Sequence, residues 1–152
     1  MGIKMGEIIS KVFVYKNSIR WEGERKGIVS SDNKPSFKVA TPPEFKGHPG
    51  IWSPEDLFVA SVNVCIMTTF LHYAERNKLE FLSYKSDAEG VLEIIDNSFM
   101  FSEIKIRPLL EVKKDLDINK AKDLIELSEK NCLISNSIKS KVSVIPEINL
   151  GF

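Results

Sequence analysis

Residue types that mark many functional sites are scarce in this chain of 152 residues, which has two cysteines, two histidines and four arginines. Neither His48 nor His72 belongs to a C-x-x-C or similar ligand cluster, so the sequence gives no sign of a metal site. It also has no glycine-rich phosphate loop, which argues against a bound nucleotide. The 21 basic and 21 acidic side chains give a net charge of zero. We therefore expect neither nucleic acid nor a membrane surface as a partner.

Length and composition are those of a globular domain. The hydrophobic content is 43% and the charged content 28%, and the length suffices for one domain with its own core. We predict a single domain spanning residues 1–152. Residues 1–10 lack the apolar stretch of a secretory signal peptide, so we expect a cytoplasmic protein. In that compartment a pair of cysteines is more often reactive than a structural disulfide.

The longest apolar run, residues 57–74, contains no charged side chain. It follows Ser53-Pro54-Glu55-Asp56, which is typical of a helix start. We predict a helix from Pro54 to about residue 77, buried in the core, with Cys65 near its middle. A membrane span is disfavoured because five polar side chains interrupt the run.

Strands and turns are predicted on both sides of this helix. A loop rich in proline and glycine at 41–52 precedes it, and the turn Asp96-Asn97 joins two long strands after it. The predicted strands are 11–15, 18–21, 27–30, 36–40, 81–95, 98–112 and 141–145, with a second helix at 117–130 and a turn or short helix at 135–139. This order predicts an α+β fold with antiparallel N-terminal strands rather than a parallel doubly wound sheet.

Two segments resemble the OsmC/Ohr family, which takes its name from osmotically induced protein C and the organic hydroperoxide resistance proteins. One runs from the proline-containing loop TPPEFKG through WSPEDLFVA, with Cys65 ten residues after Glu55. The other begins at Cys132 and is similar to the family's Cys-Pro-Val-Ser-Asn segment, with Leu133 in place of the proline. The resemblance covers residues 20–144 and fits a broader OsmC-like branch better than the Ohr branch.

The resemblance implies an OsmC-like fold in an intertwined homodimer, and a thiol-dependent peroxidase that reduces organic hydroperoxides without a cofactor. It implies that Cys65 attacks the peroxide and that Cys132 resolves the sulfenic acid as a disulfide. A dithiol, such as a lipoylated protein, would then reduce the disulfide. It further implies an arginine beside the thiolate, held by Glu55. Arg25 matches best by position, and Arg20 is the runner-up.

Each of these residues also has a structural interpretation. A buried thiol has a raised pKa, so Cys65 needs a nearby cation, and His72 lies two helical turns away. Carboxylates such as Glu55 are favoured at helix starts whatever the function, and Arg25 is equally a solvated turn residue. Without the resemblance, two independently buried cysteines would be the better interpretation.

Two further hypotheses follow from the sequence. The alternative function is a non-catalytic OsmC-like stress or small-ligand-binding protein, whose thiols pack and do not turn over. Separately, a helix apolar on nearly every side is hard to bury within 152 residues. A second copy would cover it, so we predict a homodimer with an apolar interface.

Overall fold

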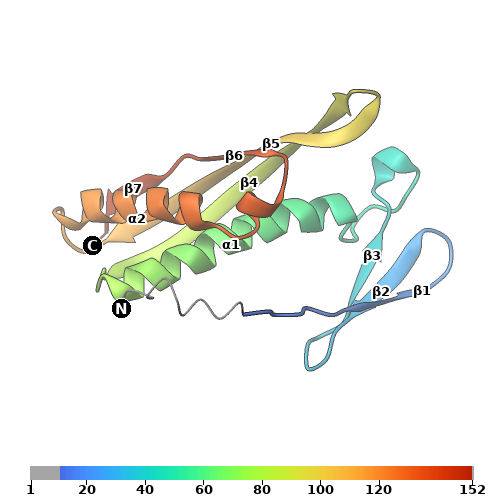
Figure 1. Cartoon of the computed structure of the whole chain (residues 1–152), viewed down its shortest axis with the longest axis horizontal. Helices are drawn as coiled ribbons and strands as arrows, with labels where there is room; N and C mark the ends of the chain where they lie inside the picture. Colours follow the sequence, from blue (N-terminus) through green and yellow to red (C-terminus); the bar gives the residue numbers. More distant parts are fainter. Residues whose placement is uncertain (1–10, 152) are drawn as a thin grey trace. The chain divides into compact units, whose positions relative to one another are not determined.

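The computed structural model describes residues 11–151. The chain divides into two compact units, Met1–Pro54 and Glu55–Phe152, which are described separately here (Figure 1). The prediction that residues 1–10 form no signal peptide lies outside the described residues and stays a prediction.

An antiparallel sheet in the order β1-β2-β3 forms the N-terminal unit. Its strands are β1 (Ser18–Trp21), β2 (Lys26–Ser30) and β3 (Phe37–Ala40), which confirms three of the predicted strands to within one residue. Residues that pair directly across strands share a face. One face of this sheet is therefore apolar, and it carries Ile19, Trp21, Val29, Phe37 and Val39.

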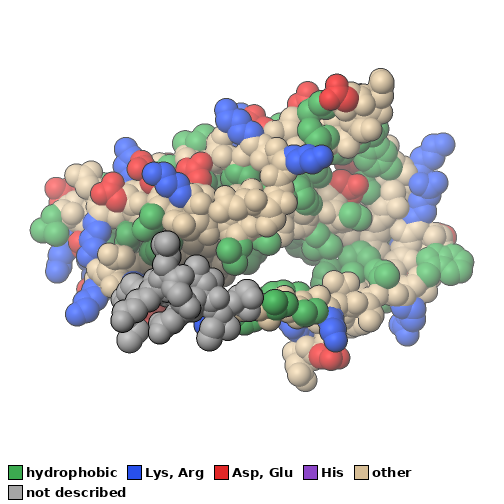
Figure 2. All heavy atoms as spheres, in the orientation of Figure 1, with side chains coloured by type: hydrophobic (Ala, Val, Ile, Leu, Met, Phe, Trp, Pro, Cys, Tyr) green, Lys and Arg blue, Asp and Glu red, His purple; other side chains and the backbone are tan. Residues whose placement is uncertain are grey.

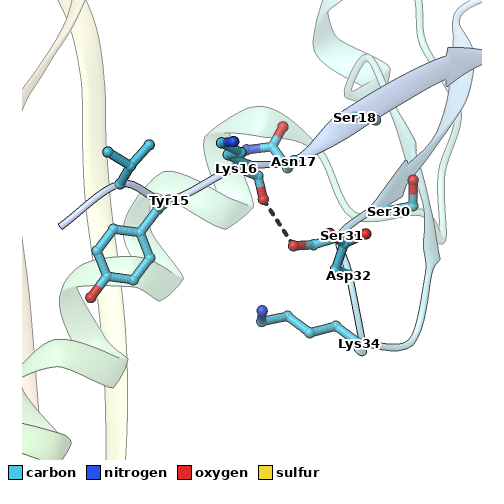
Figure 3. A pocket seen from close by; sticks show the side chains of 9 residues that line it. Tyr15, Lys16, Asn17, Ser18, Ser30, Ser31, Asp32 and Lys34 are labelled. Carbon is cyan, nitrogen blue, oxygen red and sulfur yellow. Dashed lines mark hydrogen bonds between the residues drawn. The ribbon is translucent and has the colours of Figure 1, made fainter.

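The strand predicted at residues 11–15 is wrong. Val12, Phe13, Val14 and Tyr15 are between 73% and 92% exposed, and within the described part of the chain no strand pairs with them. Alternation of β-branched and aromatic residues favours a strand only where a neighbouring strand supplies hydrogen bonds. The following residues are held instead by the Ser31 hydroxyl, which donates to the carbonyl oxygen of Lys16 at 2.8 Å (Figure 3).

The loop after β3 folds back onto the sheet of the N-terminal unit. It contains the short 3-10 helix η1 (Pro43–Phe45), and the N–H of Ala40 donates to the carbonyl oxygen of Trp52 at 2.9 Å. A Cβ on Gly47 would lie 1.6 Å from the carbonyl oxygen of Thr41, so only glycine fits this turn. The loop thereby delivers the chain to the start of the first long helix.

The C-terminal unit is built around a long antiparallel hairpin. Its elements are α1 (Pro54–Arg76), β4 (Phe81–Ile95), β5 (Ser98–Val112), α2 (Asp117–Asn131), the 3-10 helix η2 (Ser135–Ser137), β6 (Lys141–Val144) and β7 (Glu147–Leu150). β5 pairs with β4 on one side and, in parallel, with β6 and then β7 on the other. Both predicted helices and the hairpin are confirmed to within one residue. β7 was not among the predicted strands. It follows Pro146, and a proline removes only one hydrogen-bond donor, so the chain can pair again directly after it.

Both helices cover the same face of this sheet (Figure 1). Alternate residues of β5 point toward them, as expected for a strand with one buried face. One core cluster joins α1 to the middle of β5 through Val62, Ile66, Ile104 and Ile106. The other joins α1, α2 and the end of β5 through Phe70, Ala74, Leu110, Val112, Ala121, Leu124 and Ile125.

α1 buries one side and leaves another exposed. Val62, Ile66, Phe70 and Ala74 are fully buried or nearly so, whereas Val64 is 54% exposed. Among the described residues, this helix is long and apolar enough to cross a membrane, judged by its length and composition alone. Of its most apolar 18-residue stretch, 22% is buried. The helix that the sequence predicted is therefore present, with apolar side chains such as Val64 that its own unit leaves uncovered.

Charged side chains are distributed in the way that the balanced composition predicts. On the face shown in Figure 2, basic and acidic side chains are interspersed rather than separated by sign. Several pair in the C-terminal unit, among them Arg107 with Glu89 at 3.6 Å and Lys113 with Glu80 at 3.8 Å. These pairs are exposed and contribute little to stability.

Candidate active site

The fold of the C-terminal unit brings the two cysteines together. Cys132 is the first residue after α2 and belongs to the core cluster that includes Val62 and Ile66, and it has no exposed surface. Cys65, on α1, packs against the same cluster, and both thiols are free. Cys65 is half-buried rather than fully buried as predicted. It lies about 60° around the helix from the fully buried Val62, at the border of the exposed stripe.

A tight turn after α2 positions Cys132 and the residues that follow it. The N–H of Ser135 donates to Cys132 Sγ at 3.5 Å, and the N–H of Asn136 donates to the Cys132 carbonyl oxygen at 3.0 Å. The N–H of Ser137 donates to the carbonyl oxygen of Ile134 at 3.0 Å.

These contacts make the two thiols chemically unequal. Burial raises the pKa of Cys65. The S–H of Cys132, the N–H of Ile134, the hydroxyl of Thr69 and the N–H of Leu133 stabilise its thiolate more strongly, so the pKa is lowered. Thr69 Oγ1 lies 3.9 Å from Cys65 Sγ. Burial also raises the pKa of Cys132, and the neighbouring Cys65 raises it further. Cys65 is therefore the thiol that ionises first.

The predicted arginines belong to the N-terminal unit. Arg25 donates from Nη1 to the carbonyl oxygen of Phe45 at 2.9 Å and lines a hollow of about 610 Å³ together with Trp21 and other residues of the apolar sheet face. Arg20 lies on the other face and pairs with the exposed Glu22 at 2.7 Å. The role of either arginine beside Cys65 would join the two units and stays a prediction.

Glu55, the second residue of α1, has one oxygen in need of a donor. Its Oε2 is buried, and no residue of the described chain hydrogen-bonds to it. A buried carboxylate oxygen without a donor is unfavourable, so this position suits a basic or hydrogen-bonding partner. The predicted role of Glu55 in holding an arginine is chemically reasonable here and stays a prediction.

The two histidines lie in different units of the chain. His72 is exposed and packs edge-on against the ring of Tyr73, with centroids 5.3 Å apart. In the N-terminal unit, His48 Nε2 lies 3.2 Å from a carboxylate oxygen of Glu24. Between residues 11 and 151, no three His, Cys, Asp or Glu side chains are grouped so that they could hold a metal ion.

Sequence reasoning missed the neutral groups that act on Cys65. Thr69 follows it by four residues on a predicted helix, and this spacing alone would have identified it as a neighbour. The N–H groups of Leu133 and Ile134 carry no such signal, because the direction of a backbone donor depends on the turn that holds it. The expectation that Cys65 needs a cation overlooked this source of stabilisation.

Comparison with known proteins identifies the family to which this α+β protein with its paired thiols is related. Residues 47–147 match the family model described as OsmC-like protein. An uncharacterised protein of Acinetobacter baylyi is 30% identical over 138 residues, which cover 89% of this chain and 93% of the relative. The chain belongs to the OsmC-like family.

Solved structures confirm the fold. An OsmC-like protein of unknown function from Vibrio cholerae superposes with a TM-score of 0.75 at 21% identity, over 89% of this chain and 99% of the other. An organic hydroperoxide resistance protein from Legionella pneumophila gives a TM-score of 0.70 at 23% identity, over 91% and 100% of the two chains. A cytoplasmic location remains a prediction.

Proposed function

We propose that this protein is a cytoplasmic thiol-dependent peroxidase that reduces organic hydroperoxides. The observation that carries the proposal is that the fold brings two free thiols, the half-buried Cys65 and the buried Cys132, to one core cluster. Their surroundings also lower the pKa of Cys65 and raise that of Cys132. A peroxidatic cysteine must ionise to attack, and a resolving cysteine must stay protonated until the first step is complete. Solved relatives of the same fold that are named organic hydroperoxide resistance proteins support this reaction class.

The proposed reaction has three steps. The Cys65 thiolate attacks the terminal oxygen of ROOH, forming the sulfenic acid and releasing RO⁻, which takes a proton to leave as the alcohol. The Cys132 sulfur then attacks the Cys65 sulfur, the S–O bond breaks, and water leaves as the disulfide forms. A dithiol reductant, for example a lipoylated protein, finally exchanges with the disulfide and restores both thiols while it is itself oxidised.

Arg25 is the residue that we propose to contact the thiolate and the peroxide, with Glu55 as its partner. The unpartnered buried oxygen of Glu55 supports this role, because a bidentate arginine–carboxylate pair would satisfy it. Arg20 is the weaker candidate, since Glu22 already pairs with it at the surface. The apolar side chains around the pair would favour an alkyl hydroperoxide over hydrogen peroxide.

A homodimer is part of the same proposal. The uncovered stripe of α1 includes Val64 and Leu71, which are 54% and 38% exposed. Apolar stripes of this kind mark association surfaces more often than free ones. Because Cys65 lies at the border of this stripe, a second copy that covered it would also shield the thiol from bulk water.

The test is steady-state consumption of cumene hydroperoxide with dihydrolipoamide as the dithiol. Cys65→Ser should abolish turnover, and Cys132→Ser should allow one reduction before overoxidation. Arg25→Ala should lower kcat/KM about 100-fold, as loss of one stabilising donor does elsewhere, whereas the matched Arg20→Ala should behave as wild type. A wild-type rate in Cys65→Ser would refute the proposal. Folded wild-type protein that consumes no peroxide would favour the non-catalytic stress or small-ligand-binding alternative.

A further inference from the structure

Two neighbouring threonines lie one helical turn after Cys65 on α1, and their side chains make different contacts with it. The Thr68 hydroxyl donates to the Cys65 carbonyl oxygen at 3.2 Å, whereas Thr69 Oγ1 lies 3.9 Å from Cys65 Sγ. We propose that Thr69 is a positioning residue, whose hydroxyl donates a hydrogen bond to the Cys65 thiolate from its buried side. This inference takes from the proposed function only the role of Cys65 as the nucleophile.

Helix geometry places the two threonines on opposite sides of Cys65. Each residue advances about 100° around the helix, so Thr69 lies about 40° from Cys65, toward the fully buried Val62. Thr68 lies about 60° from Cys65 in the other direction, and it is exposed whereas Thr69 is half-buried. Water can replace a donor on the exposed side of the sulfur, but it cannot reach the buried side. Loss of the Thr69 hydroxyl would therefore leave that side of the thiolate without its donor.

The Thr68 contact favours a Thr69 hydroxyl that faces the sulfur. A threonine hydroxyl in a helix commonly donates to the carbonyl oxygen three or four residues earlier. The residue four positions before Thr69 is Cys65, whose carbonyl oxygen already accepts the Thr68 hydroxyl. A neutral thiol can donate to the Thr69 oxygen or accept from it, but a thiolate can only accept. Ionisation of Cys65 therefore requires only a rotation of the hydroxyl hydrogen, because the branched side chain restricts χ1.

The groups close to the Cys65 sulfur within the C-terminal unit are neutral. Cys132 is the titratable group packed beside it. Burial raises the pKa of Cys65, and the Thr69 hydroxyl is among the groups that lower it. On β5, Glu103 and Lys105 alternate with the inward-facing residues and pair with each other at 3.9 Å. The other titratable groups on elements around Cys65 are partly or fully exposed, namely Glu129 and Lys130 on α2, Lys141 on β6, Asp87 and Glu89 on β4 and His72 on α1.

Thr69→Val and Thr68→Val form a matched pair, because valine keeps the shape of threonine and removes its hydroxyl. The experiment is the rate of iodoacetamide alkylation at Cys65 as a function of pH, with the site confirmed by peptide mapping. Thiolate is the reacting species, so the midpoint of the profile reports the ionisation of Cys65. In Thr69→Val this midpoint should lie about 0.7 pH units above that of the wild type, which is about fivefold less thiolate near neutral pH. In Thr68→Val, and in Thr69→Ser, which retains the hydroxyl, the midpoint should stay at the wild-type value.

A purely structural role for Thr69 would lower the rate at every pH and leave the midpoint unchanged, and this result would overturn the proposal. A midpoint that moves equally in Thr68→Val would overturn it as well. If Thr69→Val does not fold, Thr69→Ala removes the same hydroxyl and takes its place in the comparison. Because alkylation needs no peroxide and no dithiol, a shifted midpoint in a protein without peroxidase activity would support this inference while refuting the proposed function.

Discussion

Replacing Cys132 separates its effect on the ionisation of Cys65 from its role in forming a disulfide. After burial, which raises the pKa of Cys65, the S–H of Cys132 is the largest influence, and it lowers that pKa. Cys132→Ala removes this donor, so the pKa of Cys65 should rise. Cys132→Ser keeps a hydroxyl donor at nearly the same place. Neither variant can form the disulfide, so a difference between them reports on the hydrogen bond alone.

The expected magnitude follows from the strength of the lost contact. A hydrogen bond to a charged group contributes about 1.5–3 kcal/mol, and a thiol is a weak donor at a site that is only half-buried. We therefore expect a net effect of about 1 kcal/mol, or about fivefold in thiolate population below the pKa. Alkylation of Cys65 in Cys132→Ala should be slower than in Cys132→Ser by this factor near neutral pH.

The assay is again iodoacetamide alkylation from neutral to high pH. As pH rises, the alkylation rates of the wild type and of Cys132→Ser should increase over a similar pH range. The rate of Cys132→Ala should increase at higher pH, because the raised pKa of Cys65 shifts its ionisation to higher pH. All three should reach similar plateaus. The reasoning is wrong if Cys132→Ala reacts as fast as Cys132→Ser near neutral pH, or if Cys132 rather than Cys65 is the residue alkylated first.

Three further predictions concern the fold and its assembly. Ile66→Ala should lower the free energy of unfolding in urea by about 2–5 kcal/mol, since Ile66 is fully buried. The exposed control Leu133→Ala should change it by less than about 0.5 kcal/mol, and equal losses would contradict the core assignment. Gly90→Ala should cost about 1–3 kcal/mol, because the new Cβ would lie 2.6 Å from Val59 Cγ2, and wild-type stability would refute this. Val64→Asp should convert a dimer to a monomer in sedimentation velocity, whereas a monomeric wild type at micromolar concentration would refute the dimer.

Local sequence signals predicted most of the secondary structure correctly. The Pro54 start of α1, the two-residue turn between β4 and β5, and the periodic apolar residues of α2 each specify an element without help from elsewhere. Residues 11–15 failed because a strand also needs a neighbour, which no local pattern reveals. β7 was missed for the opposite reason, since its pairing with β5 outweighs the interruption at Pro146.

The candidate site could be proposed from its residues, but its geometry could not be predicted. Spacing and resemblance selected Cys65 and Cys132, and the structure places them side by side. The sequence could not predict that Cys65 would be half-buried and Cys132 fully buried. The exposure of Cys65 depends on how much of the α1 surface the side chains of β5 cover. The donors of Leu133 and Ile134 are invisible in the sequence, since every non-proline residue carries the same N–H group.

The most direct test of the central claim treats fully reduced protein with one equivalent of cumene hydroperoxide and follows intact mass with peptide mapping. The account predicts a rapid loss of two hydrogens in a Cys65–Cys132 disulfide, which Cys65→Ser abolishes. Two thiols that remain unmodified after prolonged exposure, in protein whose fold is intact, would contradict it.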